Sequence, residues 1–262
     1  MPYETELFNL PDPCSPEVIS EKIKSYQPAK VIAVGGDGTV KLVAQCLQES
    51  NIALGILPAG SANGLAKELG IPHEAGKALD IAVNGTEKSI HTIRINDEIC
   101  IHLSDIGFNA FVVKIFETEH GRGMWGYIKA SWKVLWHQPH MEVTMQIDTK
   151  SVQKKVAMVV IANATRYGSG ALINPDGKLD DDVFEVIAIK RVSIAEIFKM
   201  MFTHTPYNPG KTEVFHTHSL TIRSKRKAHF QVDGEYLGKV NAIKAGIILN
   251  AVRVIVPNET ND

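Results

Sequence analysis

The chain has 262 residues, 44% of them hydrophobic, and its 28 basic and 29 acidic side chains give a formal net charge of −1. This apolar content suffices for the core of one large or two small domains. The balanced charge excludes the bulk positive field of a nucleic-acid-binding protein, so any site for a polyanion must be local. Three cysteines without a CxxC pair argue against a disulfide framework and favour a cytoplasmic setting. The start of the chain lacks a signal-peptide pattern, and no apolar run reaches the roughly 18 residues of a membrane-spanning helix.

The first third of the chain alternates short extended segments with helical patterns, which is typical of a parallel α/β sheet. Ser15 and Pro16 mark a helix start, and Gly70 marks a helix end. The expected elements are extended segments at 4–10, 30–34 and 53–57, and helices at 15–26, from about 39, and from 61 or 62 to 69.

After about residue 90 the pattern changes to period-two segments, which indicate antiparallel strands. A β-rich second domain is therefore expected, with a few helices. The predicted strands are 99–103, 141–147, 156–163, 183–189, 219–222 and 229–232, and the predicted helices are 111–116, 124–136 and 194–201.

Two glycine-rich corners follow predicted strands in the first third. In VIAVGGDGTV (31–40) a buried strand runs into GGDG and then a helix, which places backbone N–H groups and a helix N-terminus at one point. Such a point attracts phosphate, whereas Asp37 has the wrong sign and implies a bridging Mg²⁺ or a proton to be taken. A tight turn with an N-cap aspartate is the alternative. The second corner, LPAGSANG (57–64), is expected at the same sheet edge, and neither corner matches GxGxxG or GxxxxGK[ST].

Five motifs in order along the chain resemble the diacylglycerol-kinase-type catalytic domain shared by bacterial lipid kinases, sphingosine kinases and ceramide kinases. They are GGDGT (35–39), ILPAGSANGLAKELGIP (56–72), ATRYGSGALINPDGKLDDDVFEV (164–186), QVDGE (231–235) and AVRVIVP (251–257). The resemblance implies an α/β N-terminal domain with a parallel sheet of the NAD-kinase and phosphofructokinase type, and a β-sandwich-like C-terminal domain across a cleft. It implies residues 1–90 with 247–262 for the first domain and residues 91–246 for the lipid-substrate and metal domain.

The same resemblance assigns the site residues. Asp233 would take the proton from a lipid hydroxyl, Glu235 would support ATP or metal, and Asp37 would act through Mg²⁺. Asp181 would bind metal with the backbone carbonyls of Lys178 and Val183, although a solvated turn formed by Asp176, Asp180, Asp181 and Asp182 is the alternative. The expected nucleotide contacts are Gly35, Gly36, Asp37, Gly38, Thr39, Val40, Lys41, Gly60, Ser61 and Asn63.

The sequence also departs from that family at four places. Its first predicted strand, 4–10, resembles the family's second, and an opening strand with an NPxSG-like loop is not found. Lys41-Leu42 stands where the family has Asn-Glu, Asn63-Gly64 stands where bacterial members have Asn-Asp, and Asp182 replaces a glycine.

Three further clusters each have a functional and a structural interpretation. Trp125, Trp132 and Trp136 share a predicted helix that would touch a bilayer or, as an amphipathic helix, pack on the second domain. A basic run at 223–227 (Arg223, Lys225, Arg226, Lys227) would gather an anionic head group or form a solvated hairpin end. His216 and His218 would share a strand face, a geometry compatible with metal.

The function favoured by the sequence is an ATP- and Mg²⁺-dependent lipid kinase that phosphorylates a hydroxyl of diacylglycerol or a related lipid. A weakly active or inactive nucleotide- or lipid-binding member of the family is the second hypothesis, and an NAD-kinase-like enzyme the third. The expected partner is a lipid at a membrane surface, with a homodimer left open and no nucleic acid.

Overall fold

The computed structural model describes residues 4–118, 140–166, 172–193 and 207–258, together with residues 195, 196, 199, 203 and 205. The predicted tryptophan helix at 124–136 and most of the predicted helix at 194–201 lie outside these residues. Within them, no helix is both long and apolar enough to cross a bilayer.

The first domain has the alternation of helices and strands that the sequence predicts. Its elements are α1 Pro16–Tyr26, β1 Lys30–Gly35, α2 Asp37–Cys46, β2 Ala53–Pro58, α3 Gly64–Glu68 and α4 Ala75–Asn84. Ser15 is the N-cap of α1 and Pro16 opens its first turn, as predicted. The helix at α4 was not predicted, and α3 is shorter than expected because Asn63, in a left-handed conformation (φ 51°), precedes its first residue.

Residues 4–10 do not form the extended strand that the sequence predicts, so that prediction is wrong. The segment is irregular and exposed: the side chain of Leu7 is 83% accessible, and those of Phe8 and Leu10 are also exposed. β1 lies at the edge of the sheet, and its only strand partner among the described residues is β2. Without a neighbouring strand to supply ladder hydrogen bonds, the apolar pattern of residues 4–10 does not produce a strand.

In the described residues, the second domain is built from antiparallel strands and helix α5. Its elements are β4 Glu98–Cys100, β5 Leu103–Gly107, α5 Phe108–Thr118, β6 Met141–Ile147, β7 Lys150–Val156, β8 Met158–Ala162, β9 Phe184–Ile189, a 3₁₀ turn Pro209–Lys211, β10 Thr212–Thr217 and much of β11 Ser219–Val232. β6 has the predicted bounds, and the predicted helix at 111–116 lies inside α5.

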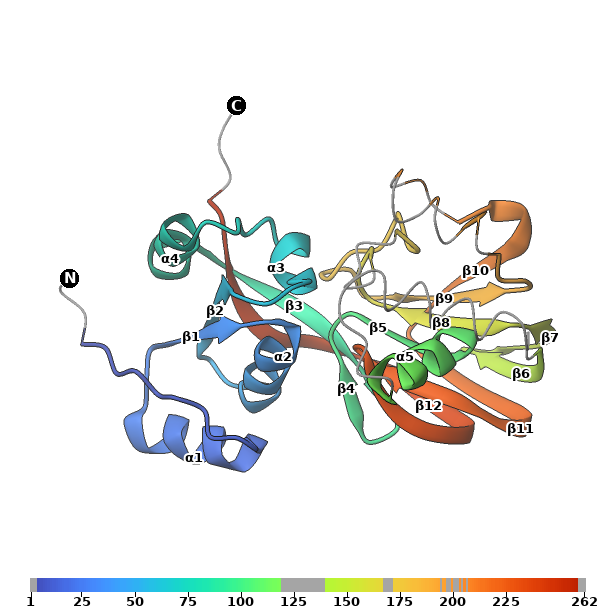
Figure 1. The fold of residues 1–262 in the computed structure, drawn as a ribbon, viewed down its shortest axis with the longest axis horizontal. Coiled ribbons are helices and arrows are strands. Elements are labelled where there is room, and N and C mark those ends of the chain that lie inside the picture. Colours follow the sequence, from blue (N-terminus) through green and yellow to red (C-terminus); the bar gives the residue numbers. More distant parts are fainter. Residues whose placement is uncertain are drawn as a thin grey trace.

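Two long strands, β3 Thr86–Ile95 and β12 Glu235–Val256, run through both domains. β12 pairs with β11 and β3 in antiparallel fashion and meets β2 in parallel at Val254 and Leu54. In Figure 1 these strands cross the centre of the molecule from the β1–β2 side to the β6–β7 side. The described strands thus form one mixed sheet in the order β1-β2-β12-β11-β5-β8-β9-β10, with β3, β4, β6 and β7 attached beside this path.

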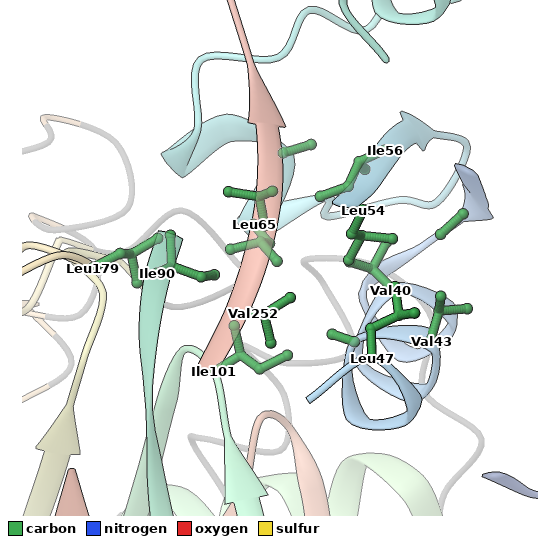
Figure 2. Packing of buried hydrophobic residues seen from close by; sticks show 14 of the residues in the cluster. Val40, Val43, Leu47, Leu54, Ile56, Leu65, Ile90, Ile101, Leu179 and Val252 are labelled. Carbon is green, nitrogen blue, oxygen red and sulfur yellow. The ribbon is translucent and has the colours of Figure 1, made fainter. Parts of the chain in front are cut away.

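Among the described residues, apolar side chains form one core in the first domain and two in the second, the smaller of which lies where α5 packs on β8 and β9. The first core packs α2, β2 and α3 against β12, through residues such as Val40, Leu54 and Val252 (Figure 2). Along β3, Ile90 belongs to this core, whereas Ile93 belongs to the larger core of the second domain. The change from one core to the other therefore falls within a continuous strand.

Three predictions for the second domain need correction. The predicted strands 219–222 and 229–232 are one strand, β11, so the basic run lies at a register irregularity inside a strand and not at a hairpin end. β10 ends at Thr217 and β11 begins at Ser219, so His216 and His218 do not share a strand face. The predicted strand 99–103 is broken between Cys100 and Leu103.

Candidate functional site

The two glycine corners lie against each other at the carboxyl ends of β1 and β2. Gly35 pairs with Pro58 at the end of the ladder, and the Ala59 N–H donates to the Gly35 carbonyl oxygen at 2.9 Å. A Cβ atom added to Gly60 would lie 2.4 Å from the Gly36 Cα atom. Because no side chain fits between these backbones, both corners need glycine where they touch.

Asp37 connects the corners through its side chain. It is the first residue of α2, and its Oδ1 atom accepts a hydrogen bond from the Leu65 N–H of α3 at 3.3 Å. The carboxylate therefore lies between the starts of two helices. The N-cap of α2 is Gly36, so the alternative in which Asp37 caps this helix is wrong. The carboxylate is an acidic group beside the glycine loop.

Asn63 shapes the second corner from within. Its Oδ1 atom accepts from the Gly60 N–H at 2.9 Å, and its amide nitrogen donates to the Gly60 carbonyl oxygen at 2.7 Å. The same nitrogen lies 2.9 Å from His73 Nε2, and the residue is only 3% exposed. The Asn63 side chain therefore fixes the loop conformation, whereas Ser61 in the same loop is exposed to solvent.

The side chains of residues 39–41, in the first turns of α2, lie in different surroundings. Thr39 lies over Gly35, where a Cβ atom would come within 2.6 Å of the threonine Oγ1. The Val40 side chain is buried in the first core, and its N–H donates to the Gly36 carbonyl oxygen at 3.0 Å. Of the two residues expected to extend the nucleotide contact, only Lys41 therefore directs a polar side chain out of the helix.

The QVDGE motif forms the tip of the β11–β12 hairpin. Val232 pairs with Glu235, and the two turn residues between them, Asp233 and Gly234, have φ values of 50° and 88°. Positive φ at both positions is what a two-residue turn of this kind requires, and Asp-Gly is a favoured pair for it. The turn geometry alone thus explains why Asp and Gly stand at positions 233 and 234 of the motif.

The Asp233 carboxylate holds this hairpin against the segment between β4 and β5. Its Oδ1 atom accepts from the N–H groups of His102 (2.9 Å) and Leu103 (3.2 Å), and its Oδ2 atom accepts from the Ile101 N–H (3.1 Å). Ile101 and His102 lie between β4 and β5 and Leu103 opens β5, so the bonds to Asp233 fall at the break in the predicted strand 99–103. The side chain of Asp233 is 9% exposed, and its lone pairs are largely occupied.

Lys41 joins the glycine corners to this hairpin across the two domains. Its Nζ atom lies 3.7 Å from Asp233 Oδ2 and 3.8 Å from Glu235 Oε2. The lysine side chain is 12% exposed, and its Nζ atom makes no hydrogen bond to any residue that the structure describes. By contrast, the Glu235 side chain is 67% exposed. A buried ammonium group therefore stands between the first turn of α2 and the acidic hairpin.

Asp105 is a polar residue of the site that sequence reasoning did not select. It is fully buried in β5, and its Oδ2 atom accepts from Asn109 Nδ2 and Gln231 Nε2, each at 2.6 Å. Gln231 in turn accepts from the Gly234 N–H at 2.7 Å, so this chain of hydrogen bonds reaches the hairpin tip. The signal in the sequence was an aspartate inside the otherwise uncharged run LSDIG, followed by a helix.

The acidic segment 180–182 lies beside β3. Asp180 pairs with Lys88 at 2.8 Å, which lowers the pKa of this aspartate, and Asp182 lies 3.5 Å from His91 Nε2. Asp181 Oδ1 is buried and has no hydrogen-bond partner among the described residues. An orphaned carboxylate oxygen of this kind fits a hard cation such as Mg²⁺. Within the described part of the chain, no three His, Cys, Asp or Glu side chains form a metal cluster, so any such ion would need backbone carbonyl ligands.

The fold places the chain in the structural class of diacylglycerol kinases and NAD kinases. A putative diacylglycerol kinase from Bacillus anthracis str. Sterne superimposes with a TM-score of 0.74 at 18% identity, covering 91% of this chain and 83% of that one. An NAD kinase from Archaeoglobus fulgidus in complex with ATP gives a TM-score of 0.52 at 15% identity, covering 95% and 82%.

The chain belongs to the diacylglycerol kinase and YegS-like lipid kinase family. Residues 1–95 match the diacylglycerol kinase catalytic domain, and residues 105–256 match the YegS C-terminal NAD kinase beta sandwich-like domain. The predicted family and the predicted two-domain fold class are therefore confirmed.

Individual relatives agree with this family. The chain is 26% identical over 242 residues to a diacylglycerol kinase of Bacillus subtilis (strain 168), covering 87% of this chain and 78% of the relative. It is 26% identical over 216 residues to a probable YegS-like lipid kinase of Chromohalobacter salexigens, covering 79% and 70%. An uncharacterized protein of Synechocystis is 27% identical over 241 residues, and there the match covers 88% of this chain but 55% of the relative.

Proposed function

We propose that the protein transfers the γ-phosphoryl group of ATP to a hydroxyl of diacylglycerol or a related lipid at a membrane surface. The family supports the reaction class, and one observation supports the site: Lys41 of α2 lies within 4 Å of both carboxylates of the β11–β12 hairpin. This contact brings the candidate phosphate loop of one domain to the acidic groups of the other. Phosphoryl transfer needs this combination of phosphate binding, charge neutralisation and a nearby base.

The glycine corners supply the phosphate-binding surface. The backbone from Gly35 to Thr39 leads into α2, so its N–H groups and the positive end of the helix dipole favour the ATP phosphates. The backbone contact between Gly36 and Gly60 leaves no side chain between the two corners. Gly38 is open on its side-chain face, since a Cβ atom there would meet nothing within 4 Å. The nucleotide would therefore contact mainly backbone.

We assign the general base to Glu235 and a positioning role to Asp233, which exchanges the roles that the sequence suggested. Asp233 accepts hydrogen bonds from three backbone N–H groups and is nearly buried, so it has little capacity to take a proton from a substrate. Glu235 is two residues away, exposed, and beside the Lys41 ammonium. In the proposed step Glu235 takes the hydroxyl proton while the oxygen bonds to the γ-phosphorus and ADP leaves.

Mg²⁺ fits two places in this chain. Asp37 lies beside the phosphate loop and would hold an ion that neutralises phosphate charge. Asp181, with the carbonyls of Lys178 and Val183, would hold a second ion, which the unpartnered Oδ1 atom supports. No hydrogen bond or ion pair of the described residues connects Asp181 to the glycine corners, so this second ion would stabilise the fold.

Radiolabelled transfer from ATP to detergent-dispersed diacylglycerol tests this function. Glu235→Gln should lower kcat by about 10²- to 10⁴-fold with little change in Tm, because it removes a base whose exposed side chain makes only a long ion pair with Lys41. Asp233→Asn should lower Tm, because the amide nitrogen would face backbone donors. Glu87→Gln, on an exposed residue of β3, is the matched control and should leave both values unchanged.

The same assay separates this function from the non-catalytic alternative. A folded wild-type protein without transfer to any lipid, combined with calorimetric binding of ATP and Mg²⁺, would establish a binding member of the family. Equal activity in the wild type and Glu235→Gln would instead remove Glu235 from the base role.

A further inference from the structure

A hollow lined by basic side chains opens at the far end of the second domain. Its volume is about 720 Å³, and its walls come from β7, β9, the turn at 209–211 and β10. Among the described residues, the Lys, Arg, Asp and Glu side chains that line it are five basic and one acidic: Lys154, Lys155, Lys190, Arg191, Lys211 and Glu213. The whole chain has a net charge of −1, so this is a strong local concentration of positive charge.

Acidic side chains hold some of these cations in place without neutralising the hollow. Glu213 lies 2.6 Å from Lys154 and 3.0 Å from Lys190, and these neighbours lower the pKa of its carboxyl group. Glu196, outside the lining, lies 3.2 Å from Lys211. Lys155 and Arg191 are exposed and form no ion pair among the described residues, although Glu142 lies opposite Lys155 in the β6–β7 ladder. Three carboxylates, those of Glu213, Glu196 and Glu142, thus accompany the five cations, and Glu142 is itself paired with Lys225, so positive charge remains.

This hollow is distinct from the candidate phosphotransfer site. None of its lining residues belongs to the glycine corners, α2 or the β11–β12 hairpin tip. Figure 1 shows β7 and β10 at the end of the molecule opposite to β1 and α1. Changes in the hollow should therefore act on what the protein binds and not on the phosphoryl transfer itself.

We propose that this hollow is a docking surface for the head-group phosphates of an anionic bilayer. The proposal rests on the proposed function, because a lipid acceptor lies in a membrane and the described residues contain no helix that could cross one. Basic clusters bind anionic leaflets by charge attraction, which each further Lys or Arg strengthens.

Exposure of the cations favours a bilayer surface over a soluble anion. The side chains of Lys154, Lys190 and Lys211 are 31%, 50% and 39% exposed, so they line the hollow and remain accessible to solvent. Sites for small soluble ligands instead enclose most of the ligand surface. Charge attraction at such an open surface extends only about 10 Å at 0.1 M salt, so binding should be lost at high salt.

Co-sedimentation with vesicles of phosphatidylcholine, with and without phosphatidylglycerol, tests the proposal without requiring turnover. The test variant is Lys155→Glu/Arg191→Glu, which changes the two lining cations that form no ion pair among the described residues. Lys24→Glu/Lys77→Glu, on exposed residues of α1 and α4, changes the net charge equally at the other end of the molecule. We expect the wild type and the control to bind only the anionic vesicles, and the test variant to bind them at least about tenfold more weakly.

Kinase assays separate this proposal from the proposed function. The test variant should retain wild-type activity on detergent-dispersed diacylglycerol and lose activity on anionic vesicles. Any of four results would overturn the docking surface. The wild type could bind neutral vesicles or bind no vesicles at all. The test variant could bind as well as the wild type, or inorganic phosphate could displace the protein from vesicles at constant ionic strength. Charge-dependent sedimentation in a protein without kinase activity would instead uphold the docking surface and reject the kinase function.

Discussion

Lys41 is the residue whose position most clearly distinguishes this chain from the family pattern, where an asparagine is expected. Its ammonium group is buried near two carboxylates at 3.7 and 3.8 Å and hydrogen-bonds to neither. Lys41→Met keeps the length and apolar stem of the side chain and removes the charge. Because a buried cation beside transferring phosphate stabilises developing negative charge, kcat for ATP-dependent transfer should fall by about 10²-fold.

The control for this prediction is Lys67→Met, on an exposed residue of the neighbouring helix α3, which should keep wild-type kcat. A purely structural Lys41 would show a lowered Tm in the methionine variant with kcat unchanged, which would contradict the prediction. Measuring KM for ATP and kcat separately shows whether the charge acts in binding or in the chemical step.

At the residue level, the GGDG and DGE motifs selected Asp37, Asp233 and Glu235, and the structure places Lys41 within 4 Å of the last two. The roles of these residues remain predictions. Which of these carboxylates is free to act depends on backbone donors at 101–103, which lie 130 to 132 residues from Asp233 in sequence, so spacing alone could not reveal it. Asn63 was expected to line the site. Its side chain also bonds both the N–H and the carbonyl oxygen of Gly60, and this role in fixing the loop is visible only in the folded structure.

At the level of elements, the hairpin that carries Glu235 is held against α5 by a histidine. The His229 ring stacks on Phe111 of α5 with centroids 4.3 Å apart, and its Nδ1 atom lies 2.8 Å from the Tyr236 hydroxyl. Burial, followed by the charges of Lys239 and Lys114, lowers the pKa of His229 from 6.5 to about 4.

This lowered pKa predicts a pH-dependent stability of the hairpin. The unfolded chain gains a proton on this histidine below about pH 6.5, whereas the folded chain does not until about pH 4. The stabilising contribution is therefore complete above pH 6.5 and is lost as the pH falls toward 4. His229→Phe keeps the ring stacking and should show a smaller fall in Tm between about pH 7 and about pH 5 than the wild type.

Scanning fluorimetry across this pH range measures the effect, with His218→Phe, on an exposed histidine, as the control. The control should follow the wild type. If His229→Phe loses as much Tm as the wild type between the two pH values, His229 does not account for the dependence.

The elements that the sequence predicted best are those whose pattern is set by one buried face. β6 alternates buried and exposed residues and was predicted with its observed bounds. β11 was divided in two because its basic run has no apolar alternation. Nevertheless β12 pairs with β11 up to Arg223 and again from Ala228, and the ladders that flank the run keep it inside one strand. For residues 4–10 the error was the opposite one: the apolar pattern predicted a strand, but the segment has no strand partner and its backbone is irregular. Tertiary pairing, absent from local sequence, decided both cases.

For the whole molecule, the main consequence of the fold is that the two domains share strands. β3 and β12 each contribute side chains to a core in both domains: β12 has Ile243 in the larger core of the second domain and Val252 and Val254 in the core of the first. Unfolding the first domain therefore removes ladder partners from the second. The division of the chain at residues 90 and 247 remains a prediction about domain function and does not imply independent folding.

We predict that both domains unfold in one cooperative transition. Val254→Ala removes a fully buried side chain of β12 from the first core and should lower the free energy of unfolding by about 2–3 kcal/mol. Leu249→Ala, in the same strand but 50% exposed, should change it by about 0.5 kcal/mol or less. Hydrogen exchange during urea unfolding, followed at Leu54 of β2 and Ile222 of β11, reports the two domains separately. In the Val254→Ala variant both amides should lose protection at the same lowered urea concentration, because β12 contributes side chains to both cores and its destabilisation affects both domains. Loss at Leu54 with Ile222 unchanged would show that the domains unfold independently despite their shared strands.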